Sequence, residues 1–194
     1  IIHALSSLLF DHDLAPCYRH DQFNIQGQGM FRLDQEKPDD IWDVEYLFDL
    51  SFAPGREALS SYRLREGVAP VAELCLVARD ADGTVGGAIR YWPVVIGEKR
   101  WPALLLGPVA VHPTHQGEGL GGLLINESMA LARELGWTRV ILVGDAPYYR
   151  RFGFEKADFL TFPPPTNPDR LLYHALEEGA FDGVSGMIGK ADQS

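Results

Sequence analysis

The chain has 194 residues, 46% of them hydrophobic and 11% aromatic, which is enough to build one packed core and matches the size of a single domain. Its 17 basic and 27 acidic residues give a net charge of -10, which opposes the phosphate contacts that dominate nucleic-acid binding. No stretch approaches the roughly 20 apolar residues of a membrane span. We therefore expect a soluble protein that binds neither nucleic acid nor membrane, whereas its acidic surface is compatible with a cationic amine.

The cysteines and the N-terminal segment bear on the compartment. Cys17 and Cys75 are too few for a disulfide framework and lack the spacing of a metal site, so we expect free thiols in a reducing cytoplasm. Residues 1–10 have no basic segment before them and contain His3, which is unlike a signal peptide. Residues 1–28 are mixed in composition, and we interpret them as an N-terminal extension to a domain over 29–178.

The first regular elements are expected from Met30 onward. A short apolar run over 30–33 predicts a strand, and apolar residues at helical spacing predict an amphipathic helix over 41–52. Pro54-Gly55 ends that helix, and residues 56–66 predict a second, shorter one.

A meander of antiparallel strands is predicted next, over 71–79, 84–96 and 101–111. The first two are joined by Asp80-Ala81-Asp82-Gly83, which is typical of a hairpin turn. Leucines on one helical face then predict a helix over 120–135, capped by Gly136. Residues 139–143 predict a strand, 147–152 one or two helical turns, and 154–162 with 171–176 a closing hairpin. The tail, 179–194, is expected to be irregular.

A glycine-rich loop separates the strand over 101–111 from the helix that follows. Its sequence is Gln116-Gly117-Glu118-Gly119-Leu120-Gly121-Gly122. Glycines allow the backbone to turn with several N–H groups pointing inward, and a helix N-terminus adds unpaired N–H groups and the positive end of its dipole. The loop therefore suits a pyrophosphate, although a plain glycine-rich turn is the simpler alternative.

The same glycines also match a dinucleotide fingerprint. Gly117, Gly119 and Gly122 satisfy the pattern G-x-G-x-x-G. That fingerprint directly follows the first strand of a repeating parallel unit, whereas four strands are expected before this loop. The Lys-Ser/Thr pair of a nucleotide P-loop is also missing. A nucleotide-binding protein thus stays an alternative that rests on the glycines alone.

Two segments in sequence order resemble motifs of a known family. The pattern Gln116-x-x-Gly119-x-Gly121, after the strand and turn over 104–113, resembles the coenzyme A pyrophosphate loop of the GNAT superfamily of N-acetyltransferases. Downstream, residues 149–154, Tyr-Arg-Arg-Phe-Gly-Phe, resemble the Tyr-x-x-x-Gly-Phe segment of that superfamily. Together with Gly144-Asp145 and Tyr148-Tyr149, they resemble a bacterial branch whose acceptors are mostly unassigned.

The resemblance implies an α/β (α+β) fold and a donor site. The sheet is expected to be mixed and mostly antiparallel, with six or seven strands, flanking helices and a splay between the fourth and fifth strands. Acetyl-CoA is the implied co-substrate. Its pantetheine arm and thioester would meet backbone groups of Val109, Ala110 and Val111, and its pyrophosphate would meet the N–H groups of Gly117, Glu118, Gly119, Leu120, Gly121 and Gly122, with Gln116 opening the loop.

The resemblance also assigns a proton donor. Tyr149 matches the tyrosine that protonates the departing thiolate, with adjacent Tyr148 as the alternative. A phenol near pKa 10 facing a thiol near 8.5 is uphill by about 2 kcal/mol, so it donates a hydrogen bond more readily than a proton. The simpler alternative for Tyr149 is a tyrosine packed beside Phe152 and Phe154.

No residue stands out as the base that deprotonates the amine. Some members of the superfamily use a glutamate on the strand before the loop, but residues 104–111 contain none. The candidates are Glu73, Asp145, His112 and Glu98, each of which could equally be a charged residue that faces water. His112 and His115 have no third ligand nearby in the sequence, so we expect no metal site.

The function expected from these motifs is transfer of an acetyl group from acetyl-CoA to a primary amine, by direct attack in a ternary complex. The alternative is a non-catalytic acyl-CoA-binding sensor or interaction module, which the missing strand glutamate keeps open. The acceptor would be an amine of a small molecule or a protein. The resemblance also allows a homodimer, because members of the superfamily often dimerise.

Overall fold

The computed structural model describes residues 22–24, 30–52 and 55–192. The expectations for residues 1–21, including the free thiol of Cys17, lie outside these ranges. Gln22–Asn24 (β1) pairs antiparallel with Met30–Gln35 (β2), so part of the stretch interpreted as an extension adds a strand to the sheet.

The predicted antiparallel meander is present. After β2 come Leu76–Arg79 (β3), Val85–Ile96 (β4) and Trp101–Val111 (β5), and each pairs antiparallel with the strand before it. The prediction that β3 begins at residue 71 is wrong. The amides of Leu74 and Cys75 donate to carbonyls three residues earlier, so Ala72–Leu74 forms a single 3-10 turn (η3) before the strand.

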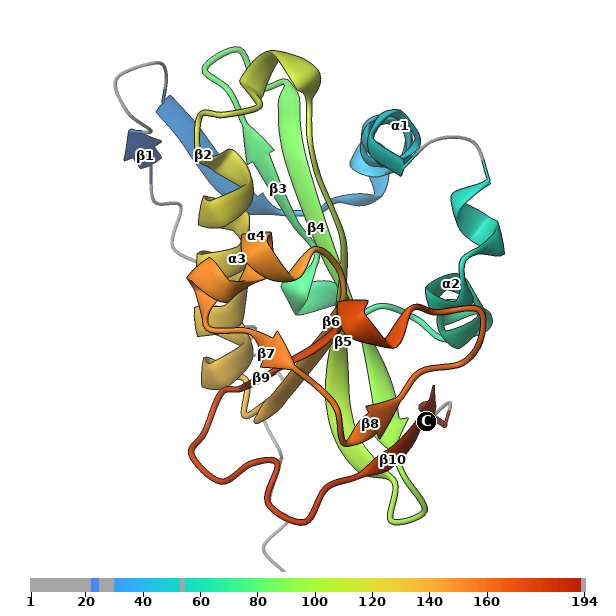
Figure 1. Cartoon of the computed structure of the whole chain (residues 1–194). Coiled ribbons are helices and arrows are strands. Elements are labelled where there is room, and N and C mark those ends of the chain that lie inside the picture. The colour runs from blue at the N-terminus through green and yellow to red at the C-terminus, as the bar shows by residue number, and fades with distance from the viewer. Residues whose placement is uncertain (1–21, 25–29, 53–54, 193–194) are drawn as a thin grey trace, which may run out of the picture.

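Helices cover both faces of the sheet (Figure 1). Ile41–Phe52 (α1) and Ser60–Arg65 (α2) lie on one face, and Leu120–Glu134 (α3) lies on the other. The second predicted helix is interrupted because Leu59 is extended, which separates the short turn Arg56–Ala58 (η2) from α2. In the described part of the chain, no helix combines the length and apolar character needed to cross a membrane.

The second half of the chain completes the sheet. Its elements are Arg139–Val143 (β6), Ala146–Tyr149 (α4), Arg150–Phe152 (η5), Glu155–Lys156 (β7), Leu160–Thr161 (β8), Pro168–Arg170 (η6), Leu171–Ala175 (β9) and Gly186–Lys190 (β10). β9 pairs antiparallel with both β6 and β7, so the closing hairpin is confirmed for β7, whereas β8 pairs parallel with β10.

The expectation of an irregular tail is wrong, because β10 belongs to the sheet. β4 is 12 residues long, and β3 pairs only with its first part, Val85 to Ile89. β10 takes the same edge farther along, where Ile188 lies opposite Ile96. Ile188 is buried there. The short apolar pair Met187-Ile188 between glycines gave too weak a strand signal to be read from the sequence.

The sheet is mixed, and the parallel pair on its main path opens partway along. Its main path runs β1-β2-β3-β4-β5-β6-β9-β7, and with β8 and β10 the described residues form ten strands, more than the expected six or seven. β5 and β6 are parallel and pair only at Leu104 with Val140 and Leu105 with Ile141. Beyond this point β5 continues to Val111 beside β4 alone. The expected splay therefore lies between β5 and β6.

A bulge in β5 accompanies this separation. The register with β4 shifts between Ile89, which faces Val109, and Tyr91, which faces Leu106, so Gly107 and Pro108 are accommodated opposite Arg90. Gly107 has a φ of 118°, a conformation that side chains other than glycine rarely adopt. On either side of this point, α3 packs Leu120 and Leu124 into the larger core, and α1 packs onto Ala88 and Ala110.

Candidate functional site

The glycine-rich loop turns from β5 directly into α3. Gly117 and Gly119 have φ values of 85° and 89°, which favour glycine, and Gly119 is the N-cap of the helix. The first intrahelical bond is donated by Leu123 N to Gly119 O at 3.0 Å. The amides of Leu120, Gly121 and Gly122 therefore have no acceptor within the helix, and they present N–H groups at its positive end.

A cavity of about 580 Å³ opens at this helix N-terminus. Its walls come from the end of β5, the loop, the start of α3 and the α4–η5 segment, and they consist of Val111, His115, Gln116, Gly117, Gly119, Gly121, Gly122, Tyr148, Arg151 and Phe152. Six of the residues predicted for the donor site are thus brought together around one space. This cavity is large enough for part of a nucleotide-sized ligand.

The other predicted donor-site residues have side chains turned elsewhere. Leu120 and Ala110 are buried in the core, so only their backbone groups could meet a ligand. Glu118 Oε2 lies 3.3 Å from Nδ1 of His115. Val109 packs partly buried against the core beneath α3. This division agrees with a strand that uses its side chains for packing and its backbone for binding.

The two adjacent tyrosines of α4 occupy different places. Tyr148 borders the cavity, and its hydroxyl lies 2.9 Å from the position that a Cβ on Gly121 would take. Tyr149 packs its ring against Gly144 at the end of β6 and makes an edge contact with Phe154. Burial raises the pKa of the Tyr149 hydroxyl above its ordinary value, and neighbouring Tyr148 adds to this rise.

The four base candidates are spread over the molecule. Asp145 follows β6 and caps α4, accepting a hydrogen bond from Tyr148 N at 3.3 Å. His112 directly follows β5, and its Nδ1 lies 2.7 Å from Thr114 Oγ1. Glu73 is exposed on η3, which directly precedes β3. Of the four, Asp145 is the one whose charge acts on Tyr149.

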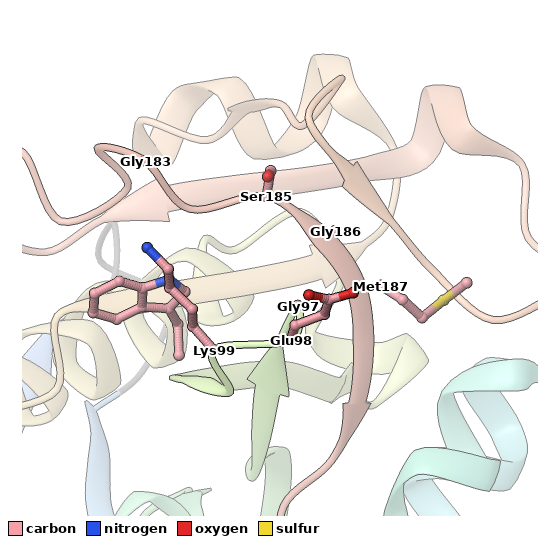
Figure 2. Close-up of a pocket in the computed structure, with 8 residues that line it drawn as sticks. Gly97, Glu98, Lys99, Gly183, Ser185, Gly186 and Met187 are labelled. Atoms are coloured by element: carbon pink, nitrogen blue, oxygen red, sulfur yellow. The ribbon is translucent and has the colours of Figure 1, made fainter.

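Glu98 lies at the opposite end of β5 from the loop. Figure 2 shows it on the turn between β4 and β5, beside Met187 of β10. It lines a second cavity, of about 610 Å³, which is bordered by Gly97, Lys99 and Trp101 of the turn region and by Gly183, Ser185, Gly186 and Met187. None of the predicted donor-site residues borders this cavity.

Sequence reasoning missed three residues of the cavity at the N-terminus of α3. His115, Arg151 and Phe152 line it, and the Arg151 guanidinium lies 4.5 Å from the centre of the Tyr148 ring. Arg151 Nε also donates to Tyr148 O at 3.3 Å. The available signal was the paired arginine directly after the two tyrosines. A cation beside a helix N-terminus makes the cavity suited to an anionic ligand.

Fold and cavity together define a class of protein. A mixed sheet whose parallel pair opens beside a glycine-rich helix N-terminus is the architecture of the GNAT acyltransferases. Residues 72–156 match the family model described as an acetyltransferase (GNAT) domain. The chain belongs to the GNAT acetyltransferase family.

Relatives with this fold extend the comparison. The chain is 32% identical over 155 residues to the uncharacterized N-acetyltransferase YhbS of Escherichia coli K12, a match that covers 79% of this chain and 92% of YhbS. The crystal structure of E. coli YhbS in complex with CoA superimposes with a TM-score of 0.72 at 30% identity, covering 82% of this chain and 88% of that one. A GNAT family acetyltransferase from Brucella melitensis, solved with acetyl-CoA, gives a TM-score of 0.55 at 35% identity, covering 78% and 98%.

Proposed function

We propose that this protein transfers an acetyl group from acetyl-CoA to a primary amine by direct attack in a ternary complex. The observation that carries the proposal is the cavity at the N-terminus of α3, which adjoins the end of β5 where the parallel pair has opened. The family membership and the CoA and acetyl-CoA bound to related structures support the same donor.

The donor would be held mainly by backbone. The amides of Gly117, Glu118, Gly119, Leu120, Gly121 and Gly122 would bind the pyrophosphate, with Gln116 at the entrance. Arg151 borders the same space and would contribute a positive charge. Val109, Ala110 and Val111 would offer backbone groups to the pantetheine arm and the thioester carbonyl, where N–H groups stabilise the developing oxyanion.

Tyr149 is proposed to assist the departing thiolate. When the amine nitrogen forms its bond to the acetyl carbon, the carbon–sulfur bond breaks and the sulfur leaves with the electron pair. Because burial raises the pKa of Tyr149, full proton transfer to a thiolate is uphill, and a hydrogen bond from the hydroxyl is the favoured form of assistance. Tyr148, which borders the donor cavity, is the alternative for this role.

The attacking amine must first lose a proton. For a lysine-like amine with a pKa near 10.4, the neutral form costs about 4.6 kcal/mol at pH 7, so a base or a water chain is required. We propose Asp145 as that base in preference to Glu73, because Asp145 stands at the open end of β6 beside Tyr149.

Ligand-dependent melting tests the donor half of the proposal. Acetyl-CoA at millimolar concentration is expected to raise the melting temperature, whereas ATP and NAD are expected not to, because only a ligand that binds the folded state stabilises it. Absence of a shift with acetyl-CoA would overturn the proposal. A shift with NAD alone would instead favour a dinucleotide site at the loop.

Release of free CoA in the presence of a panel of amines tests the transferase half. Tyr149→Phe is expected to slow turnover and to leave the acetyl-CoA melting shift unchanged, since the ring and its packing stay in place. Tyr148→Phe is the matched variant on the adjacent residue. If Tyr149→Phe is fully active and Tyr148→Phe is slow, the roles are exchanged. Binding of acetyl-CoA without turnover of any amine would indicate a sensor.

A further inference from the structure

Arg65, at the end of α2, is a partly buried cation with unmet hydrogen-bonding capacity. Its Nε and Nη1 atoms are buried and have no hydrogen-bond partner among the described residues. The guanidinium lies between two aromatic rings, 4.5 Å from the centre of Tyr62 and 4.8 Å from that of Trp92. Cation–π contacts offset part of the cost of burying the charge, but they leave the N–H groups of Nε and Nη1 without an acceptor.

Both flanking rings are held in place. Tyr62 accepts a hydrogen bond on its hydroxyl from Arg56 Nη1 at 2.7 Å, and Trp92 Nε1 donates to Val68 O at 3.1 Å. Burial lowers the pKa of Arg65 to about 10, so the side chain is still a cation at neutral pH. A fixed, planar fork of donors is the arrangement that binds a carboxylate through two parallel hydrogen bonds.

Among the carboxylates near Arg65, Glu36, Glu45 and Asp49 are engaged by other arginines, whereas Glu57 and Glu66 border the same cavity as Arg65. Glu45 bridges Arg90 at 2.6 Å and Arg56 at 2.5 Å, and Glu36 binds Arg90 through both of its oxygens. Asp49 pairs with Arg56 at 2.7 Å. Among the described residues, Arg65 forms no ion pair with a carboxylate.

Arg65 also stands close to the point where β5 leaves β6. Its Nη2 atom is 3.8 Å from the place that a Cβ on Gly107 would occupy. Gly107 precedes Val109 by two residues, which is at most about 7 Å along the chain. Arg65 approaches from the α1 and α2 face, opposite α3, and with Tyr62 it also borders a cavity of about 440 Å³. The cation is therefore on the face of the sheet opposite α3, within a short molecule's length of the proposed thioester position.

We propose that Arg65 binds the carboxylate of the acceptor, and that the acceptor is a small amino acid or a similar short amino carboxylate. This inference rests on the proposed acetyl transfer, because it places the acceptor amine beside Val109. A carboxylate supplies the two acceptor oxygens that Nε and a terminal nitrogen of Arg65 require. The spacing to Val109 favours an amine only a few bonds from that carboxylate, and a lysine side chain within a protein carries no such group.

The direct test compares acids with their amides. The full chain, saturated with CoA, is titrated calorimetrically with L-amino acids of each side-chain class and with β-alanine, each beside its primary amide. At least one acid is expected to bind about 10- to 100-fold more tightly than its amide, as a charge-assisted pair predicts. If no acid binds better than its amide, the inference is overturned, and this comparison needs no variant that could misfold.

Variants then assign the preference to one side chain. Arg65→Gln is expected to abolish the preference for the acid and to leave the melting shift with acetyl-CoA unchanged. Arg65→Lys keeps the charge without the fork and is expected to lose most of the preference. Arg63 on the same helix borders the same cavity but is exposed and donates to Pro164 O at 3.3 Å, so Arg63→Gln is the matched control and should retain the preference. A preference that survives Arg65→Gln refutes the assignment.

Turnover separates this inference from the proposed function. If acids bind through Arg65 but no free CoA is released, the carboxylate site is supported and acetyl transfer to these acids is overturned. If CoA is released equally fast with acids and amides, and Arg65→Gln does not change that rate, acetyl transfer is supported and the carboxylate site is overturned.

Discussion

Adding a methyl group at Gly121 is expected to weaken acetyl-CoA binding without unfolding the protein. An alanine Cβ there would lie 2.9 Å from the Tyr148 hydroxyl and 3.6 Å from Val111 Cγ2, and all three residues border the donor cavity. Alanine favours a helix by up to about 1 kcal/mol over glycine, and the Tyr148 hydroxyl ends a partly exposed side chain that can move aside. The methyl group would still occupy the space where the proposed pyrophosphate would approach the amides.

The size of the effect can be read from melting curves. At a concentration 100 times the wild-type Kd, acetyl-CoA stabilises the folded state by about 2.7 kcal/mol, and a tenfold weaker Kd leaves about 1.4 kcal/mol. Because 1 kcal/mol corresponds to about 2 to 4 °C for a chain of this length, the ligand-induced shift should fall by roughly half. Gly189→Ala, whose Cβ would make only an ordinary contact with Val95, is the control. A full wild-type shift in Gly121→Ala would refute a pyrophosphate site at this helix end.

Three further predictions concern the tail, a buried thiol and the proposed base. Ile188→Ala should lower the free energy of unfolding in urea by about 2 to 4 kcal/mol, whereas exposed Met187→Ala should cost less than about 1 kcal/mol; equal effects would contradict the role given to β10. Burial raises the pKa of Cys75 to about 12, whereas the pKa of the unfolded thiol is near 8.5. The stability that comes from keeping this thiol neutral is therefore present below pH 8.5 and is lost as the pH rises toward the folded pKa. Cys75→Ala should flatten the fall in melting temperature between about pH 8.5 and 11, and an unchanged slope would refute this explanation. Asp145→Asn keeps an oxygen to cap α4, so it should lower kcat/KM at pH 7 by about 100-fold with little change in melting temperature, and full activity would exclude Asp145 as the base.

Much of the fold was accessible from the sequence because its main elements carry strong local signals. The helix over 41–52 was predicted with its observed ends, and α3 differed by one residue, since apolar spacing and glycine punctuation mark both. The 3-10 turn before β3 and the break at Leu59 depend on local backbone bonds that no periodicity reveals. β10 depends on a long-range pairing with β4, and the sequence of residues 186–190 alone does not predict that pairing.

The grouping of the loop glycines around one cavity was predictable from the sequence, and the surroundings of Arg65 were not. The loop glycines lie together in the chain, so their common place at a helix end follows from one local motif. Arg151 was missed because the segment that contains it was interpreted only for its tyrosines. The sequence around Arg65 does not indicate a binding role. Its lack of a carboxylate partner becomes visible only when the positions of Tyr62, Trp92 and the paired carboxylates are known.

The late position of β10 has a consequence for synthesis. The edge of β4 near Ile96 stays without this partner until Lys190 has been made, about 90 residues afterwards, which at 5 to 20 residues per second is about 5 to 20 s. During that interval a nascent chain presents an apolar strand edge to its neighbours. Crowded polysomes and high expression temperature should therefore favour insoluble protein, and slower initiation at low temperature should favour the soluble form.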